Sequence, residues 1–454
     1  MHRPYRRWLM ILLGLGSVLR VMAASDVEAL LILVGDQHSA YARTAQFVAH
    51  VDRIKTENPA TPMAVLINGD SFEYGNAIAR RTSGAIDLAM LAALVRRAPT
   101  ILNLGNHEPE FDGAARTVER LRATGVVVVG NLRNRATGEL FAPAATRLQL
   151  GRANMVITGI TTDDLSQYRA PVRPTLDLAI PAAWAEEMFP KLLSEAPIKI
   201  LLSHVGLRHD RGVFAFVPEG ALIAGAHDHT RYVERMGKTV YIHSGSWNSH
   251  LSVVRLRLDE GAAGWDVEQR EIRDDDPADP ELRALIRVTE AKHLTDEDLK
   301  PVGKSERALG RREAARFVVE AVRRAANVDA AFIGNTTFGG GLPHGEVTEF
   351  ALNSCVRFDG TVWVTEVTGE RLRALLAKAN QGPATPFSER TGEFQFACGP
   401  AEIEAGQLYR IATNDWGVRN RKRYFGDEEI VFVEQPGLTL KSIVAAAIAA
   451  GEAK

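Results

Sequence analysis

Residues 100–111, with the sequence TILNLGNHEPEF, join a short apolar run to a cluster of polar groups. No helical period separates the run from Gly-Asn-His-Glu, so the run predicts a buried strand that ends in an amide, an imidazole and a carboxylate. Such groups are costly to bury unless something binds them. Two interpretations compete. The segment is either a polar turn that happens to carry a histidine, or a strand that delivers metal ligands and an acid/base group to a site at its carboxyl end, where open α/β sheets hold ligands.

Other predicted strands of the first half of the chain end in polar residues of the same kind. Their clusters are GDQH with Asp36 and His38, NGD with Asp70, SH with His204, and GAHDH with His227 and His229. One such cluster alone is typical of a turn or a helix cap. Because parallel strands deliver their carboxyl ends to one edge of a sheet, the ordered set predicts a single site.

This set supplies the ligands that a pair of divalent cations requires. Two cations about 3.5 to 4 Å apart need a bridging carboxylate and further ligands on each side. Asp70 suits the bridge. Asp36, His38 and His229 complete one shell, and Asn106, His204 and His227 complete the other. Mixed nitrogen and oxygen ligands suit Mn, Fe, Co or Zn, and the absence of cysteine from this region disfavours a structural zinc knot.

The same residues carry a family resemblance. The motifs Asp36-x-His38, Gly69-Asp70, Gly105-Asn106-His107-Glu108, Ser203-His204 and His227-x-His229 resemble those of the calcineurin-like metallophosphoesterase superfamily. The two-domain plan is similar to the 5'-nucleotidase family, which includes UDP-sugar hydrolases and cyclic-nucleotide phosphodiesterases. The resemblance implies an α/β fold: a four-layer α/β/β/α metallophosphoesterase domain followed by a smaller α+β 5'-nucleotidase C-terminal-like domain.

The resemblance also implies an activity. The family hydrolyses phosphate esters, and a metal-bridged hydroxide attacks phosphorus in line. We expect a small-molecule phosphate ester, a 5'-nucleotide or a related nucleotide compound, as substrate. UDP-sugars and cyclic nucleotides are alternatives. So is a sulfur ester on a carrier protein, the substrate of the thiosulfohydrolases in this superfamily.

His107 directly follows the predicted ligand Asn106. It is therefore expected to lie beside the metals and to stabilise the transition state or help the leaving oxygen. In the family an acidic residue three positions later orients this histidine, usually within His-Glu-Phe-Asp. Here that position is Glu110, in HEPEF, and Asp112 is the competing candidate.

The second domain of the family binds the nucleoside. The resemblance places Phe396 and Trp416 as an aromatic pair around the base, which binds any flat ring, and Asn335 and Arg357 as polar contacts. Both aromatics are equally suited to a hydrophobic core. The family's usual arginine is missing from the segment GNTTFGGGLPHGEVT, and Arg357 is the candidate to replace it.

Composition and the amino terminus set the remaining expectations. The chain has 454 residues, 46% of them hydrophobic, which is enough for two or three domains. A net charge of -2 leaves no global basic field for nucleic acid. Basic residues, the apolar run WLMILLGLGSVL and VMAAS predict a signal peptide at 1–25, too short for a permanent membrane span, and hence a periplasmic or secreted protein.

The pattern along the chain divides it into segments. Apolar runs alternate with helical patterns at 26–270, the predicted catalytic domain, and an acidic, proline-containing stretch opens a predicted linker at 271–300. Residues 301–454 form the predicted substrate-binding domain. The only two cysteines, Cys355 and Cys398, allow one disulfide in an oxidising compartment.

Overall fold

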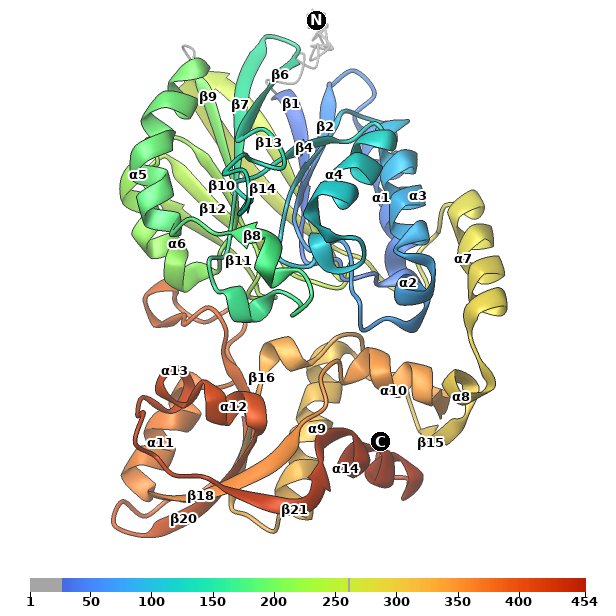
Figure 1. Ribbon diagram of the computed structural model, residues 1–454, viewed down its shortest axis with the longest axis vertical. Helices are drawn as coiled ribbons and strands as arrows, with labels where there is room; N and C mark the ends of the chain where they lie inside the picture. Colours follow the sequence, from blue (N-terminus) through green and yellow to red (C-terminus); the bar gives the residue numbers. More distant parts are fainter. Residues whose placement is uncertain (1–26, 260–261) are drawn as a thin grey trace, which may run out of the picture.

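The computed structural model describes residues 27–259 and 262–454, so the predicted signal peptide at 1–25 lies outside the described residues. The chain forms a larger first domain and a smaller second domain, which lies beneath the first in Figure 1. Two six-stranded sheets pack face to face in the first domain, with helices on both outer faces. The predicted fold class, α/β with four layers and a smaller second domain, is confirmed.

The first sheet is parallel in its centre and carries an antiparallel hairpin at one edge. In spatial order its strands are β14 (Ala262–Glu271), β13 (His250–Asp259), β1 (Val27–Val34), β2 (Met63–Asn68), β3 (Thr100–Asn103) and β4 (Val127–Val129). The second sheet is also mixed. Its strands are β11 (Arg231–Met236), β12 (Thr239–Ser244), β10 (Leu222–Gly225), β9 (Ile198–His204), β7 (Ala153–Thr161) and β6 (Ala145–Leu150).

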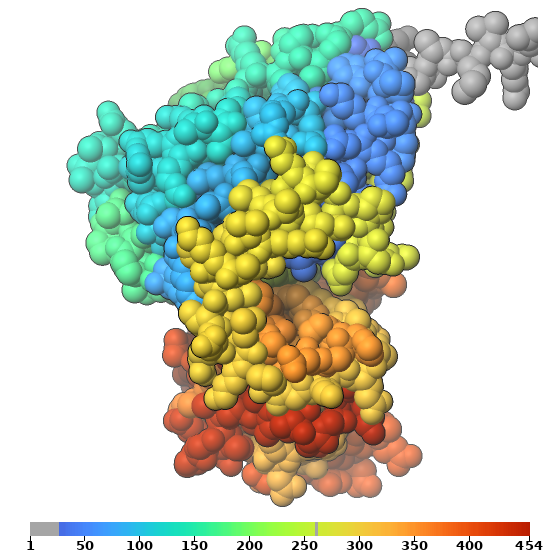
Figure 2. All heavy atoms as spheres, turned by 90° about the vertical axis from the view of Figure 1, so that its right-hand side faces the viewer, coloured from blue at the N-terminus to red at the C-terminus, as the bar shows by residue number. Residues whose placement is uncertain are grey.

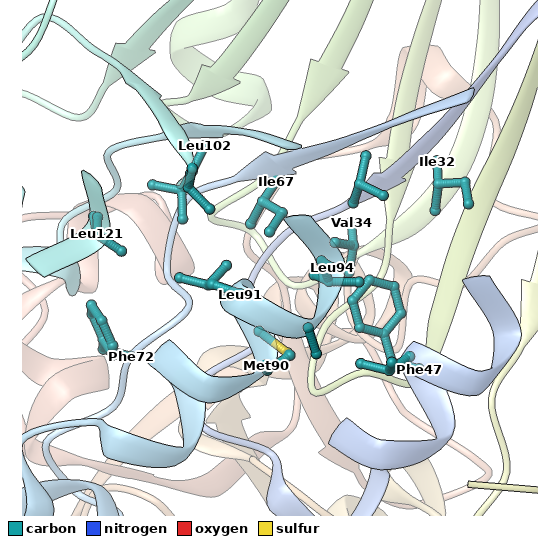
Figure 3. Packing of buried hydrophobic residues seen from close by; sticks show 14 of the residues in the cluster. Ile32, Val34, Phe47, Ile67, Phe72, Met90, Leu91, Leu94, Leu102 and Leu121 are labelled. Carbon is teal, nitrogen blue, oxygen red and sulfur yellow. The ribbon is translucent and has the colours of Figure 1, made fainter. Parts of the chain in front are cut away.

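The sequence of β1 is apolar at every central position because both faces of this strand are buried. Side chains alternate across a strand, so Leu31 and Leu33 face the second sheet while Ile32 and Val34 face the helices. Both faces are buried, and a strand buried on both sides reads as a continuous apolar run. Figure 3 shows the helix side of this sheet, where Ile32 and Val34 lie near Phe47 of the first helix.

Helices cover both outer faces of the paired sheets. The first sheet is covered by α1 (Tyr41–Glu57), α2 (Ala77–Thr82), α3 (Ala85–Val95) and α4 (Gly113–Ala123), and the second by α5 (Pro181–Leu192) and α6 (Leu207–Val213). A short two-stranded sheet joins β5 (Arg133–Asn134) to β8 (Leu176–Asp177).

The second domain is built on a five-stranded mixed sheet. Its strands are β19 (Gln395–Cys398), β16 (Ala330–Gly334), β20 (Leu408–Asn414), β18 (Thr361–Thr368) and β21 (Val433–Thr439), and a separate pair joins β15 (Pro301–Ser305) to β17 (Gly345–Thr348). Its helices are α8 (Asp296–Leu299), α9 (Arg311–Ala325), α10 (Glu349–Cys355), α11 (Gly369–Lys378), α12 (Asp415–Arg419), α13 (Arg421–Phe425) and α14 (Leu440–Ala449). One core lies under α9, α10 and α14, and a second lies under α11 and α13.

The segment predicted as a linker, 271–300, contains the helix α7 (Pro280–His293). Leu282 and Ile286 of α7 join the core on the helix side of the first sheet. Figure 2 shows this segment, in yellow, running along one side of the first domain and down to the second.

Two further sequence-based expectations concern the membrane and the cysteines. No described helix has the length and apolar character needed to cross a bilayer. Cys355 is buried and Cys398 is partly exposed, and both are free thiols, so the disulfide that the sequence allowed is not formed.

Candidate metal centre

The predicted ligands come from the carboxyl ends of strands in both sheets of the first domain. Asp36 follows β1, Asp70 follows β2, and Asn106 follows β3 in the first sheet. His204 ends β9 and His227 follows β10 in the second sheet. The structure therefore brings together residues that lie more than 100 positions apart in the sequence.

Asp36, His38 and His229 form the first of two ligand groups. Nε2 of His38 lies 2.8 Å from Nε2 of His229 and 4.0 Å from Oδ1 of Asp36. One donor atom from each of the three residues falls within 4.8 Å of the others. Two nitrogens bound at right angles to one ion, each about 2.1 Å from it, stand about 3 Å apart. The spacing of the two imidazoles therefore fits a shared cation.

The second group contains Asp70, His204 and His227. Nε2 of His204 lies 3.0 Å from Oδ2 of Asp70 and 3.8 Å from Oδ1 of Asp36. Nδ1 of His204 lies 2.7 Å from the carbonyl oxygen of Asn68. With a cation bound, a proton on Nδ1 would donate to that carbonyl and leave the lone pair of Nε2 for the metal, as in histidines that bind metals.

Two atoms of the residues predicted to bind the second ion are buried without a hydrogen-bond partner among the described residues. They are Nε2 of His204 and Oδ1 of Asn106, whose amide nitrogen donates to the carbonyl of Gln167. A buried polar atom left unpaired is costly. A cation in the centre would satisfy both atoms, so the residues present fit a metal-binding role.

Backbone strain is concentrated in the same loops. Five of the predicted ligands adopt positive φ angles: Asp36 (51°), His38 (49°), Asp70 (54°), His227 (78°) and His229 (54°). Non-glycine residues in this region cost of order 1 to 3 kcal/mol each and persist only where the surroundings hold them. Clustered strain of this kind is typical of a functional site.

Two asparagines that the sequence analysis did not single out join the two sheets at this edge. Asn68 and Asn103 pair directly across β2 and β3. The side chain of Asn68 donates to the carbonyls of Ser203 and Ala224, and that of Asn103 donates to the carbonyls of Ile160 and Leu202. These bonds fix the strand ends of one sheet against those of the other. Each asparagine ends an apolar run, which is the signal that sequence analysis could have used.

Glu108 fixes the loops of Asp70 and Asn106 to each other. Its buried carboxylate accepts hydrogen bonds from the backbone N–H groups of Asp70, Ser71 and Gly105, at 2.7 to 2.9 Å. Gly105 leaves no room for a side chain, since a Cβ there would fall 2.2 Å from Oδ1 of Asp70. Glu108 therefore has a structural role, and these hydrogen bonds explain why a carboxylate is buried after β3.

His107 lies beside the ligand groups and faces two carboxylates. Its Nε2 is 3.9 Å from Oδ2 of Asp70, and its Nδ1 is 3.0 Å from Oε1 of Glu110. Asp112, the competing candidate, instead forms an ion pair with Arg120. The geometry therefore favours Glu110 as the partner of His107. Glu73, which the sequence analysis did not identify, lies 3.8 Å from Nδ1 of the same ring.

Burial sets the direction of most pKa shifts among the ligands, but neighbouring charges outweigh it at Asp70 and at His204, whose pKa the carboxylates of Asp70 and Asp36 raise to about 9. Burial lowers the pKa of His38, and lowers that of His227 and His229 well below the ordinary value, which keeps these rings in the neutral form that binds metals. Burial raises the pKa of Asp36 to about 8. Burial also acts to raise the pKa of Asp70, but the charges of His204 and His107 hold it well below the usual range. A cation among these groups would favour the ionised form of Asp36.

A cavity of about 350 Å³ extends from the ligand groups into the second domain. His107, His229 and Asp70 line one side, and Arg357 and Trp416 line the other. Trp416 and Arg357 therefore both border this cavity, and their predicted role in substrate binding stays a prediction.

The structure corrects two predictions for the second domain. Phe396 is fully buried in the core, against Phe338 and Phe394, and does not line the cavity, because its side of β19 faces the helices. Asn335 is also fully buried. Its amide nitrogen donates to the carbonyl of Asp228 at 2.8 Å, and its oxygen accepts from the N–H of Phe394. Asn335 thus attaches the second domain to the loop between His227 and His229 and has no free group for substrate.

Comparisons with known proteins agree with this architecture. The family model for calcineurin-like phosphoesterases matches residues 29–231, and the model for the 5'-nucleotidase C-terminal domain matches residues 291–424. The chain thus combines a calcineurin-like phosphoesterase domain with a 5'-nucleotidase C-terminal domain. With these two domains it is a metal-dependent phosphoesterase.

Solved structures of distant relatives share the fold of this phosphoesterase. A 5'-nucleotidase precursor from Thermus thermophilus is 16% identical, with a TM-score of 0.62 over 93% of this chain and 96% of that one. A sulfate thiohydrolase, SoxB, from Thermus thermophilus is also 16% identical, with a TM-score of 0.65 over 93% and 94%. A 5'-nucleotidase from Candida albicans is 13% identical, with a TM-score of 0.61 over 94% and 98%. No curated protein matches the sequence of this chain.

We predict that Asp70→Asn in this phosphoesterase lowers metal affinity by more than about 100-fold, because loss of an outer-shell partner alone costs about 10- to 100-fold. Metal content after dialysis, measured by mass spectrometry, checks this. Asp112→Asn is the matched control, because Asp112 pairs with Arg120 outside the centre and should leave metal content unchanged. Wild-type metal content in Asp70→Asn would refute a bridging role.

We also predict that His107→Ala lowers kcat by about 10² to 10⁴ while the metals stay bound, since acid/base and electrostatic groups contribute at this level. Glu110→Gln should lower kcat by about 10- to 100-fold, because it removes the partner of the ring. Steady-state kinetics with Asp112→Asn as control test this assignment. An unchanged kcat in Glu110→Gln together with a lowered kcat in Asp112→Asn would instead make Asp112 the partner of His107.

Proposed function

We propose that this phosphoesterase hydrolyses phosphate esters of nucleotides, most simply 5'-nucleotides, in the cavity between its two domains. The observation that carries the proposal is the cavity itself, which joins the ligand groups of the first domain to the aromatic side chains Trp416 and Phe358 of the second. Its volume, about 350 Å³, lies within the range of roughly 300 to 1,000 Å³ usual for small-molecule sites. A nucleotide fits such a cavity, with its phosphate beside the ligand groups and its flat base beside the aromatic side chains.

The roles of the side chains follow from their places. Asp36, His38 and His229 would hold one divalent ion, and His204 and His227 the other, with Asp70 between them. Asn106 would add its unpaired Oδ1 to the second ion. When bound, such ions activate water and neutralise charge on the phosphoryl group, and Mn, Zn, Co and Fe all suit these ligands.

His107 is the catalytic side chain of the proposal. Oε1 of Glu110 lies 3.0 Å from Nδ1 of His107, and this ion pair directs Nε2 toward the ligand groups, 3.9 Å from Oδ2 of Asp70. From there Nε2 donates a hydrogen bond to the charge that develops on the phosphoryl or leaving oxygen. Because burial keeps water away, this bond is stronger than it would be in solution.

Aromatic stacking in the proposal uses a different pair from the one that the sequence indicated. Trp416 lines the cavity, and so does Phe358, whose side chain is 49% exposed despite its apolar character. Phe358 follows Arg357 directly, in the loop between α10 and β18. The two rings supply the flat apolar surfaces that a nucleobase requires.

A second candidate is hydrolysis of a sulfur ester on a carrier protein. The fold likeness to the sulfate thiohydrolase, with a TM-score of 0.65, supports it, as does the absence of the family's arginine from GNTTFGGGLPHGEVT. UDP-sugars and cyclic nucleotides remain alternatives within the nucleotide class. Under each of them the predicted signal peptide places the protein in the periplasm or outside the cell.

A substrate panel tests the proposal. Purified protein loaded with Mn or Co is assayed with 5'-nucleotides, UDP-sugars, cyclic nucleotides, simple phosphate esters and a protein-bound thiosulfonate. We expect the highest kcat/KM with a 5'-nucleotide and loss of activity on chelation with EDTA. Turnover of the thiosulfonate alone would establish the second candidate and overturn the first.

Trp416→Ala should raise KM for nucleotides about 5- to 100-fold with little change in kcat, because stacking contributes about 1 to 3 kcal/mol per base. Phe396→Ala is the matched aromatic control. It should leave KM unchanged and instead lower the free energy of unfolding by about 3 to 5 kcal/mol, as expected of a core phenylalanine. Nucleotide kinetics and chemical denaturation of both variants check this. An unchanged KM in Trp416→Ala would refute stacking.

A further inference from the structure

Arg357 is a residue of the second domain whose side chain ends in the first. Its Nη2 lies 2.5 Å from Oε1 of Glu73, and the two side chains are only 2% and 3% exposed. Its guanidinium also lies over the ring of Trp247, 4.9 Å from the centroid. Glu73 and Trp247 both belong to the first domain, so one arginine makes a buried ion pair and a cation–π contact across the domain boundary.

Both partners of Arg357 also contact the ligand His38. Oε2 of Glu73 lies 3.4 Å from Nδ1 of His38. The Trp247 ring stacks on the His38 ring with centroids 5.1 Å apart and an interplanar angle of 21°. The backbone N–H of Trp247 donates to the carbonyl of Asp36 at 2.8 Å, which fixes the tryptophan to the metal loop. The contacts form a closed ring of four side chains, with the ligand at one corner and the second domain at the opposite corner.

The charges explain why this ring depends on the arginine. Glu73 is buried, and Arg357, whose Nη2 lies 2.5 Å from Oε1, supplies the positive charge that compensates its carboxylate. Without Arg357, the carboxylate keeps one hydrogen bond, from the backbone N–H of Gly75 at 2.9 Å, and its nearest ionisable side chains are His38 and His107, at 3.4 and 3.8 Å. A buried charge without its partner is strongly unfavourable, so the carboxylate or these rings would have to move.

We propose that Arg357 is a positioning residue that holds His38 in its metal-binding orientation through Glu73 and Trp247, so that docking of the second domain completes the metal centre. The proposal rests on His38 being a metal ligand, as in the proposed function. It assigns to Arg357 a role other than the substrate contact expected from the sequence. Metal ligands are commonly oriented by a carboxylate on the second ring nitrogen, and here that carboxylate is itself fixed from another domain.

The test uses the full chain, stripped of metal and titrated with Co²⁺, with the absorption of the bound ion as readout. Arg357→Gln should weaken one Co²⁺ site by about 10- to 100-fold and lower kcat by a similar factor, the usual effect of removing an outer-shell partner. Arg357→Lys should recover part of the loss, because it keeps the charge without the planar contact to Trp247. Arg371→Gln is the matched control, since Arg371 pairs with Asp427 inside the second domain.

Glu73→Gln and the double variant Glu73→Gln/Arg357→Gln complete the test. Loss of Arg357 alone leaves a buried charge that can destabilise the fold, whereas the double variant leaves none. We expect the double variant to lose less Co²⁺ affinity than the product of the two single losses, because the residues act on each other. If the loss of Co²⁺ affinity in the double variant equals the product of the losses in the two single variants, the proposal is overturned.

A second result would also overturn it. Wild-type Co²⁺ affinity and kcat in Arg357→Gln, with only KM raised, would make Arg357 a substrate contact. Because Co²⁺ binding is read without substrate, the result stands even if no nucleotide is hydrolysed. Failure of the positioning role is thereby distinguished from failure of the proposed function.

Discussion

The metal centre depends on the relative position of two separate sheets, because the carboxyl ends of strands from both must lie side by side. Three of the ligand loops follow strands of the first sheet, and the others follow strands of the second. Apolar packing between sheets is not directional and does not fix their relative position by itself. The side-chain amides of Asn68 and Asn103 fix it, because each donates hydrogen bonds to carbonyls of strands in the facing sheet. Buried amides are unfavourable unless paired, so only one relative position of the sheets satisfies both.

A cation is the component that would make this arrangement favourable. The loops of the centre hold Asp36, Asp70 and His229 in left-handed backbone conformations. Its two carboxylates and the rings of His38 and His204 are almost completely buried. Nε2 of His204 and Oδ1 of Asn106 have no hydrogen-bond partner among the described residues. Ligation would satisfy the free lone pairs and offset both the strain and the burial. The second domain adds to this at two points, through Asn335 on the loop of Asp228 and through Arg357 on Glu73.

The sequence predicted the architecture of the first domain because the relevant signals are local. Apolar runs mark buried strands, and Asp or His directly after a run marks a strand end that carries function. The sequence did not correctly predict the residues that line the cavity in the second domain. Nothing in the residues around Phe396 or Asn335 indicates which side of the strand or loop faces the cavity. Glu73 and Arg357 lie 284 residues apart in the sequence, and only the docking of the two domains brings them together. Glu110 was one of two candidates because the family resemblance has an acidic residue three positions after the histidine, and only the geometry favours it over Asp112.

Anomalous diffraction from a crystal grown with Mn²⁺ or Co²⁺ tests the central claim most directly. The account predicts two peaks about 3.5 to 4 Å apart, the spacing usual for paired metal ions. One peak should lie among Asp36, His38 and His229, and the other among Asp70, His204 and His227. A single peak, or peaks that none of these side chains contacts, would contradict the account.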